Sequence, residues 1–254
     1  MAMNRGERLT QILDVIKTNS MLKLGDIAKI LSVSEMTIRR DIAASSGRLV
    51  QLGGYIFDSK NLPSEASSIS EQHLDRHTSQ KQLIGHKAIA HIQAGDTLFL
   101  DCGTTMPYLA RNLPLDIPLT CICYSLNIAE ILSRRSNISL LMLGGLYHPS
   151  SQSFSDEQAL ATLKNIGINK AFLSASGIHR TRGLSCSNFY EVAIKRTVVK
   201  NAIQKIVLAD SSKFDVVKPM LFADLQDIDA IITDDDLMQE EREAFLELYP
   251  ELKI

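Results

Sequence analysis

The feature that most constrains the fold is a regular alternation of short apolar runs and helical patterns beyond residue 80. Strands that alternate with helices in this way form a parallel or mostly parallel sheet with helices on both faces. The sequence therefore predicts an α/β domain over residues 80–254, which is long enough to bury a substantial core. Its strands are expected at 97–100, 119–123, 138–143, 170–174, 205–209 and 229–233.

Composition excludes several other classes of protein. Hydrophobic residues make up 45% of the chain and charged residues 22%, so there is enough apolar surface to build a core, and disorder throughout is excluded. No apolar run reaches the roughly 18 residues that a membrane helix needs, and the polar start of the chain does not resemble a signal peptide. We therefore expect a soluble protein of the cytoplasm.

The cysteines and histidines indicate no metal site. Four cysteines are too few for a disulfide framework in 254 residues, and no Cys-x-x-Cys pair is present. Cys121 and Cys123 are two apart in an apolar run, a spacing that places both on one face of a strand. His73 and His77 have the i, i+4 spacing of metal ligands, but they lie in a polar segment, 58–79, that we interpret as a solvated interdomain linker.

The first 57 residues have the outline of a helix-turn-helix. A first helix with one buried face is predicted by the i, i+3, i+4, i+7 spacing of Leu9, Ile12, Leu13 and Ile16. A second helix is expected over 24–31, and Ser34 is placed to cap a third that begins at Glu35. This segment has a net charge of +3 and the rest of the chain −5, so a polyanion partner is favoured at one end only.

The third predicted helix has an outer face suited to DNA. Ile38 and Ile42 share one face and should pack inward, which leaves Thr37 and Arg40 outward with Arg39 on the flank. Arginine can bind guanine or clamp a phosphate in the major groove. A solvated, charged helix face is the alternative. The residues that we expect at DNA are Ser34, Met36, Thr37, Arg39, Arg40 and Arg48.

After Gly47 the apolar period changes to two, which predicts a β-hairpin with Gly53-Gly54 in its turn and Arg48 at its base, in reach of a phosphate. A hairpin directly after a recognition helix is a wing. The stretch 33–41, Val-Ser-Glu-Met-Thr-Ile-Arg-Arg-Asp, followed by Leu-Gly-Gly at 52–54, resembles the winged-helix signature of the DeoR family of bacterial transcriptional repressors. This resemblance implies that residues 1–57 form a winged helix-turn-helix that binds double-stranded operator DNA.

Polar residues cluster where the predicted strands of the larger domain end. In open parallel sheets, ligands bind beyond the carboxyl ends of the strands, so the cluster predicts one pocket there. The strand-end residues are Asp101, Tyr124-Ser125, Gly144-Gly145, Ser174 and Ser176, Asp210, and Thr233-Asp234.

The sharpest of these segments is Asp-Cys-Gly-Thr-Thr at 101–105, between a strand and a helix. Gly103 permits close approach of the backbone, and the amides and hydroxyls of 103–105 suit a phosphate. The Gly-Lys-Ser/Thr of a Walker motif is absent, which disfavours nucleotide hydrolysis. The alternative is a capped helix without a ligand.

Two lysines lie near this predicted edge. Lys213 follows a strand and could give a second contact to the phosphate, or it is an ordinary surface lysine. Glu191 and Lys195 are four apart on a predicted helix, a spacing also typical of a routine surface ion pair. Whether Lys195 or Lys213 forms a Schiff base with an open-chain sugar is left open by the sequence.

The resemblance to the DeoR family continues through residues 80–254. Segments 101–105, 174–177 and 210–214, with Glu191, are similar to the family's effector domain, whose fold is shared with ribose-5-phosphate isomerase and glucosamine-6-phosphate deaminase. It implies a homo-oligomeric repressor, without a cofactor, that a sugar phosphate on the Gly-Thr-Thr loop and Lys213 releases from its operator. Segments 52–56, 101–105 and 123–127 look most like members that control deoxyribonucleoside catabolism and respond to deoxyribose 5-phosphate.

The residues expected at the effector, from the strand ends and the resemblance together, are Asp101, Gly103, Thr104, Thr105, Ser125, Asn127, Gly145, Ser176, Gly177, Glu191, Lys195, Asp210 and Lys213. None is expected to be catalytic. An isomerase needs a carboxylate near the sugar carbons, and ribose-5-phosphate isomerases carry Asp-Gly-Ala-Asp-Glu where this chain has Ser-Ala-Ser-Gly-Ile-His at 174–179. A sensor is therefore favoured; the alternative is an isomerase-like enzyme whose N-terminal domain mediates other contacts.

Overall fold

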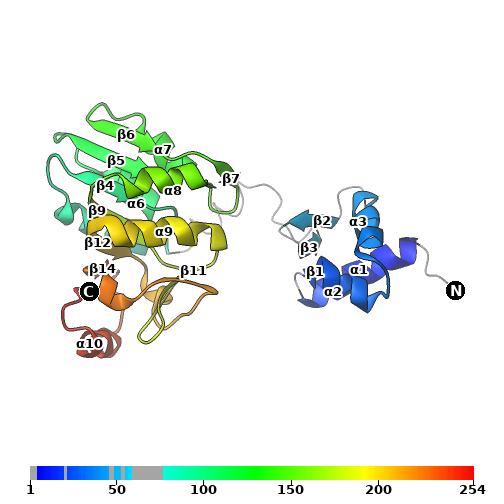
Figure 1. Cartoon of the computed structure of the whole chain (residues 1–254). Coiled ribbons are helices and arrows are strands. Elements are labelled where there is room, and N and C mark those ends of the chain that lie inside the picture. Colours follow the sequence, from blue (N-terminus) through cyan, green and yellow to red (C-terminus); the bar gives the residue numbers. More distant parts are fainter. Residues whose placement is uncertain (1–4, 20–21, 46–48, 53–54, 59–76) are drawn as a thin grey trace. The chain divides into compact units, whose positions relative to one another are not determined.

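The computed structural model describes residues 5–19, 22–45, 49–52, 55–58 and 77–254. The chain divides into two compact units, a head (1–69) and a body (70–254), which are described separately (Figure 1). The predicted linker, 58–79, falls mostly outside the described residues; Asp58 ends a strand of the head, and a helix of the body begins at Thr78. No helix in the described parts is both long and apolar enough to cross a membrane.

The described part of the head contains three helices and a small sheet. The helices are α1 (Arg5–Asn19), α2 (Leu24–Ile30) and α3 (Glu35–Ala43), and the strands are β1 (Leu22–Lys23), β2 (Leu49–Leu52) and β3 (Tyr55–Asp58). Strand β3 lies between the other two and is antiparallel to both. The helix-turn-helix and the hairpin are thus confirmed, while the glycines predicted in the hairpin turn, Gly53 and Gly54, lie outside the described residues.

The periodic apolar side chains of the head meet in one core. Ile12 of α1, Ile27 of α2 and Ile38 of α3 are almost completely buried, and Ile56 of β3 closes the cluster from the sheet side. Each helix therefore gives its apolar face to the same small volume, and the opposite face of α3 is left to solvent.

The body is built on a six-stranded parallel sheet with the strand order β14-β12-β9-β4-β5-β6. All six correspond to the predicted apolar runs. Their bounds are β4 (Thr97–Leu100), β5 (Leu119–Cys123), β6 (Ile138–Met142), β9 (Ile168–Ser174), β12 (Ala202–Leu208) and β14 (Ala230–Ile232).

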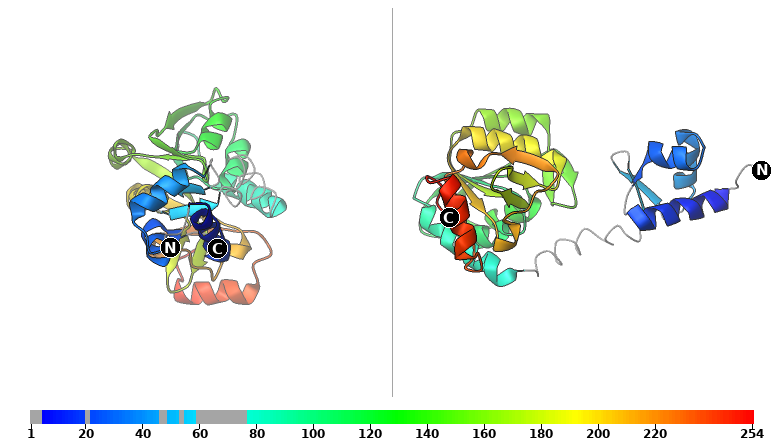
Figure 2. Two further views of the ribbon diagram at one scale, coloured as in Figure 1. Left: turned by 90° about the vertical axis from the view of Figure 1, so that its right-hand side faces the viewer. Right: turned by 90° about the horizontal axis from the view of Figure 1, so that it is seen from below.

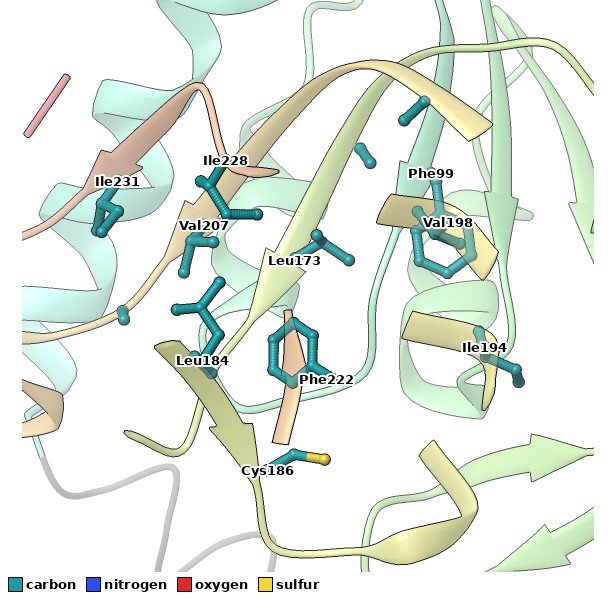
Figure 3. Packing of buried hydrophobic residues seen from close by; sticks show 14 of the residues in the cluster. Phe99, Leu173, Leu184, Cys186, Ile194, Val198, Val207, Phe222, Ile228 and Ile231 are labelled. Carbon is teal, nitrogen blue, oxygen red and sulfur yellow. The ribbon is translucent and has the colours of Figure 1, made fainter. Parts of the chain in front are cut away.

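Helices cover both faces of this sheet (Figure 1). One face packs on α5 (Thr78–Ala88), α6 (Met106–Asn112) and α7 (Leu126–Leu132), and the other on α8 (Glu157–Lys164) and α9 (Phe189–Asn201). Successive strand residues alternate between the two cores: Leu98 and Leu100 face α5–α7, whereas Phe99 faces α9. Figure 3 shows Phe99, Leu173 and Val207 of the sheet in one apolar cluster with Ile194 and Val198 of α9, and Phe99 lies beside Val198.

Several short strands were not predicted. A second, antiparallel sheet is formed by β10 (Gly177–His179), β11 (Gly183–Cys186) and β13 (Met220–Ala223), and β7 (Leu146–His148) pairs with β8 (Ser153–Ser155) as a hairpin. At the other end of the main sheet, Lys253 pairs in parallel with Ala230 of β14. Helix α10 (Gln239–Leu248) precedes that segment and is drawn in red (Figure 2).

We predict that Ile38→Ala lowers the free energy of unfolding of the head by about 2–5 kcal/mol, because Ile38 is fully buried and the small domain has little core to spare. Ile30→Ala is the matched control, since Ile30 is 54% exposed and should change the same quantity by less than about 1 kcal/mol. Hydrogen-exchange mass spectrometry of the intact chain reads head and body peptides separately. Equal losses of unfolding free energy in the two variants would contradict the assignment of Ile38 to the core.

Candidate functional sites

The outer face of α3 is the candidate DNA-binding surface. Ser34 caps the helix as predicted: its Oγ accepts a hydrogen bond from the Thr37 amide at 3.2 Å and lies 3.0 Å from the Thr37 hydroxyl. Met36 is 58% exposed, and the side chains of Arg39 and Arg40 are exposed as well. Two cations and a hydroxyl therefore share one surface, the arrangement that groove recognition needs. Arg48, predicted at the wing, lies outside the described residues.

A buried ion pair fixes this helix on the rest of the head. Asp41, on the inner side of α3, is only 1% exposed. It accepts hydrogen bonds from Nε and Nη2 of Arg8 on α1, at 2.7 and 3.1 Å. This two-point contact sets the rotation of α3, and with it the direction in which Arg40 points.

The predicted edge of the body contains a second, fully buried ion pair between Asp101 and Lys195. Asp101 directly follows β4, and Lys195 lies in the middle of α9. The Lys195 Nζ also donates to the Ser174 carbonyl oxygen at 2.9 Å and lies 3.8 Å from Glu191 Oε2. Asp101, Glu191 and Lys195, all predicted at the effector, are thus brought together, and the i, i+4 pair on α9 is no surface ion pair.

The carboxylate of Asp101 is surrounded by donors. Its Oδ1 accepts from the Tyr124 hydroxyl at 2.5 Å and from the Cys102 amide at 2.8 Å, and its Oδ2 accepts from the Ser174 amide at 2.7 Å. Burial raises the pKa of both Tyr124 and Cys102 well above their ordinary values, and the nearby Asp101 charge adds to the effect. Both groups are therefore neutral at physiological pH and act as donors, not as nucleophiles.

Lys195 keeps its charge in this environment. Burial by itself would lower the pKa of Lys195, but the carboxylates of Asp101 and Glu191 outweigh burial and raise it above the ordinary value. A protonated amine without solvent access is a poor nucleophile, so the geometry disfavours the Schiff base that the sequence left open for this residue.

The loop after Asp101 has the backbone conformation that glycine favours. Gly103 has a φ of +123°, and a Cβ at this position would lie 2.9 Å from the Ser174 Oγ. Thr104 is half-buried, and Thr105 occupies the position before α6 without a side-chain capping bond. The predicted Gly-Thr-Thr loop therefore lies directly against the end of β9.

The other predicted residues are distributed along the same edge. Ser125 precedes α7 and its hydroxyl bonds to the side chain of Asn127. Gly145, with a φ of +133°, forms the turn between β6 and β7, where a Cβ would be 2.6 Å from the Ser155 carbonyl oxygen. Ser176 and Gly177 lead into β10 and the second sheet, and no contact links them to Asp101 in the described part of the chain.

A cluster of charges follows β12. Asp210 accepts hydrogen bonds from the Ser212 amide, at 3.2 Å, and hydroxyl, and Lys213 Nζ lies 3.7 Å from its other oxygen. Sequence reasoning missed Lys81 of α5, which is 4% exposed; burial lowers its pKa, and the charges of Asp210 and Lys213 act on it. Asp234, one of the strand-end residues that the sequence places at this edge, accepts from the Ser211 amide at 2.8 Å.

Sequence reasoning also missed Tyr124 and Cys102 as partners of Asp101. Their only signal was their place beside strand ends, which any turn residue shares. One cavity of about 270 Å³ lies along β14, and the predicted strand-end residue Thr233 is part of its lining. The other lining residues are Lys87, His91, Ala230, Ile231, Ile232, Arg242, Lys253 and Ile254. No group of three metal-ligating side chains occurs within the described ranges.

Comparison with known proteins adds independent information. A family profile described as "DeoR-like helix-turn-helix domain" matches residues 8–61, and one described as "DeoR C terminal sensor domain" matches residues 76–235. The chain is 36% identical to the deoxyribose operon repressor of Escherichia coli K12 over 92% of both chains. It is 33% identical to the lactose phosphotransferase system repressor of Lactococcus lactis over 96% of both.

A search of solved structures finds more distant likenesses. Ribose 5-phosphate isomerase A from Methanocaldococcus jannaschii matches 54% of both chains at 18% identity, with a TM-score of 0.41. An eIF2B assembly from Chaetomium thermophilum matches 75% of this chain and 70% of that one at 13% identity, with a TM-score of 0.48.

We predict that Lys195→Met lowers the free energy of unfolding by about 3–5 kcal/mol, because it leaves the Asp101 carboxylate buried without its cation. The double variant Asp101→Asn/Lys195→Met should lose less than the sum of the two single variants. Denaturant unfolding near pH 7 checks this cycle. Because the pKa of Lys195 is raised, its contribution is complete at all pH values below about 10.4 and is lost only as the pH rises through the raised value. If the losses of the two single variants added up to that of the double variant, Asp101 and Lys195 would not be directly coupled.

A trapping experiment tests the chemistry of Lys195. Incubation with an aldehyde sugar phosphate and cyanoborohydride at neutral pH should leave Lys195 unmodified, since its amine is protonated and buried. Peptide mass spectrometry measures the adducts, and the exposed Lys200 serves as the reactive control. An adduct on Lys195 that forms faster than the one on Lys200 would contradict the assigned charge state.

Proposed function

Because the chain belongs to the DeoR family of transcriptional repressors, we propose that it represses a sugar or deoxyribonucleoside catabolic operon. The proposed effector that releases it from DNA is a phosphorylated sugar, deoxyribose 5-phosphate. The observation that carries the proposal is that one chain contains both features. The head has an exposed Arg39/Arg40 surface on α3, and the body, a separate unit, has a Gly-Thr-Thr loop that follows the buried strand β4. A protein that binds operator DNA acts where the DNA is, so we propose the cytoplasm as its location.

The proposed DNA contacts are Ser34, Met36, Thr37, Arg39, Arg40 and Arg48. Ser34 is already engaged in capping α3, so it positions the helix and can add one phosphate contact. The two arginines are the groups that can read guanine or neutralise phosphate.

The proposed effector contacts divide into two groups. The phosphate would lie at Gly103, Thr104 and Thr105, with Lys213 supplying charge and Lys81 added as a second cation. The sugar would contact polar groups along the edge. These belong to Ser125, Asn127, Gly145, Ser176, Gly177 and Asp210. Asp101, Glu191 and Lys195 would hold the loop in position and would not contact the effector, since Asp101 and Lys195 already form an ion pair.

Binding without turnover is proposed because the edge lacks the carboxylate run that ribose-5-phosphate isomerases carry at the corresponding strand end. The stretch 174–179 carries no carboxylate, and Asp101 is held by Lys195 and by four other donor groups on Cys102, Tyr124 and Ser174. His179 accepts hydrogen bonds within its own turn, from Thr181. The relative named for the deoxyribose operon supports deoxyribose 5-phosphate as the effector, and the relative named for a lactose system shows that relatives of this chain serve different sugars.

The proposal requires the effector to bind the DNA-free state more tightly. Release of the operator by 100-fold corresponds to about 2.7 kcal/mol of coupling.

We predict that Arg40→Ala weakens operator binding by at least about 10-fold and leaves sugar-phosphate binding unchanged, because it removes a DNA contact alone. Lys213→Ala should do the reverse, giving a repressor that holds DNA and ignores the inducer. Gel shifts with the upstream DNA of its own operon measure the first property, and calorimetry with deoxyribose 5-phosphate and related sugar phosphates the second. Lys200→Ala, an exposed lysine of α9, is the control for both.

Two results would contradict this division of labour. One is loss of both activities in both folded variants, which would mean that head and body do not act separately. The other is turnover of a pentose phosphate well above background, which would favour an enzyme over a sensor.

A further inference from the structure

The cavity of about 270 Å³ along β14 is separate from the proposed effector edge. It is lined by β14, by the end of α5 and the turn of 3-10 helix that follows it (Ile89–His91), by α10 and by the segment at Lys253. Helix α10, drawn in red, lies below β14 in Figure 1. The residues expected at the effector all belong to the described part of the chain, and none of them lines this cavity. The proposed function therefore assigns it no role.

The charged part of the lining is entirely basic. Lys87, Arg242 and Lys253 contribute cations, and no aspartate or glutamate is among the lining residues. Lys87 Nζ lies 2.7 Å from the exposed carboxylate of Asp235, and Arg242 Nη1 donates to the Ile254 carbonyl oxygen at 2.5 Å. Lys253 forms no ion pair with any side chain that the structure describes. The cavity therefore has positive charge that the chain does not neutralise.

His91, which also lines the cavity, experiences this positive charge. Burial lowers the pKa of His91, and the charges of Lys170 and Lys253 lower it further. The ring is therefore neutral at physiological pH and offers one N–H donor. The carboxylate of Asp229, close to Lys253 along the sheet edge, is directed to Lys205: it accepts from the Lys205 amide at 2.7 Å and lies 3.1 Å from its Nζ.

The rest of the lining is mostly apolar. Strand β14 contributes Ala230, Ile231 and Ile232. A sugar or another polyhydroxylated compound would lose hydrogen bonds to water against this wall without replacing them. The volume corresponds to about nine water molecules at roughly 30 Å³ each, which suits a small metabolite and not a nucleotide or a peptide. The lining thus favours an occupant that has both a negative charge and an apolar part.

Thr233 adds a polar group to the same wall. It is 4% exposed and lines the cavity, and its buried Oγ1 has no hydrogen-bond partner among the described residues. Its carbonyl oxygen accepts from Lys87 Nζ at 3.1 Å, so Thr233 is held beside one of the cations. Because a buried hydroxyl without a partner costs free energy, an acceptor oxygen brought in by a ligand would be favoured at this position.

We propose that this cavity is a binding site for a small organic acid, in which the basic residues hold a carboxylate and the β14 wall covers a hydrocarbon part. Hydrogen bonds from lysine or arginine to a carboxylate are among the strong ones, and the Thr233 hydroxyl gains an acceptor. Inorganic phosphate satisfies the cations but leaves the apolar wall uncovered, so it is the poorer ligand. The site goes beyond the proposed function, because its residues differ from those assigned to the sugar phosphate.

Hexanoate is the probe that tests the chemical class of the ligand. It should bind the full chain at least about 10-fold more tightly than hexanamide, which has nearly the same shape without the charge. Saturation-transfer NMR titrations measure both dissociation constants. Inorganic phosphate, which has the charge without the hydrocarbon, should displace hexanoate only at concentrations well above the dissociation constant of hexanoate.

Two variants test the location. Lys253→Gln keeps the backbone pairing with Ala230 and should weaken hexanoate binding by at least about 10-fold. Thr233→Val should also weaken it, while the Tm stays equal or rises, because the removed hydroxyl has no partner in the free protein. Lys164→Gln, an exposed lysine of α8, is the matched control and should leave the affinity unchanged. Circular dichroism with thermal melting gives the Tm and checks that each variant is folded.

Four results would overturn the inference. They are no saturation transfer at about 10 mM hexanoate, equal affinities for hexanoate and hexanamide, an affinity that Lys253→Gln leaves unchanged, or displacement of hexanoate by deoxyribose 5-phosphate, which would move the acid to the effector edge. The outcome is independent of the proposed function: a chain that binds hexanoate in this way but neither operator nor sugar phosphate would keep the acid site and reject the repressor.

Discussion

The buried Asp101–Lys195 ion pair is the interaction on which the arrangement of the body's functional edge depends. Two opposite charges without solvent contact are tolerated only when their remaining hydrogen-bonding capacity is met, since desolvation costs several kcal/mol per ion. Here Tyr124, the Cys102 amide and the Ser174 amide complete the shell of Asp101, while the Ser174 carbonyl oxygen and Glu191 complete that of Lys195. The pair therefore joins β4, β5, β9 and α9 at one point, and the Gly103 loop starts from that point.

The head also contains an ion pair with a buried carboxylate that positions a helix. Its core is too small to fix helix orientation by packing alone, and the Arg8–Asp41 contact adds a directional bond between α1 and α3. Ile38 and Asp41 lie on the inner side of α3, so Arg39 and Arg40 are left on the outer side. In both units a paired buried charge positions an exposed polar surface.

Helix α9 connects the features of the body. It packs on one face of the sheet through Ile194 and Val198, holds the ion pair through Lys195, and meets the β7–β8 hairpin through Tyr190. A helix moves as a rigid element, so a displacement at the ion pair is transmitted to the hairpin without a chain of small side-chain shifts.

The sequence by itself determined the positions of all six strands of the main sheet and the inward faces of the helices. Strands buried on both faces are continuous apolar runs, and helices with one buried face repeat every three to four residues, so both signals are local. Strands β7, β8, β10 and β11 gave no such signal, because glycine, serine or histidine interrupts the apolar residues of each. Strand β13 is an apolar run of four residues that was not predicted. The α3 surface followed from the same periodicity, once Ile38 and Ile42 were assigned inward.

Only the tertiary structure decided which polar side chains meet. Asp101 and Lys195 are 94 residues apart, and the sequence allowed Lys195 to be a surface partner of Glu191, as the i, i+4 spacing suggests. Its burial, the approach of Lys81 to Asp210, and the stacking of His148 on Tyr190 all depend on how β-strands and helices distant in sequence come side by side. The physical reason is that periodicity reports burial of a face, whereas a charge pair requires two particular positions to be opposed in space.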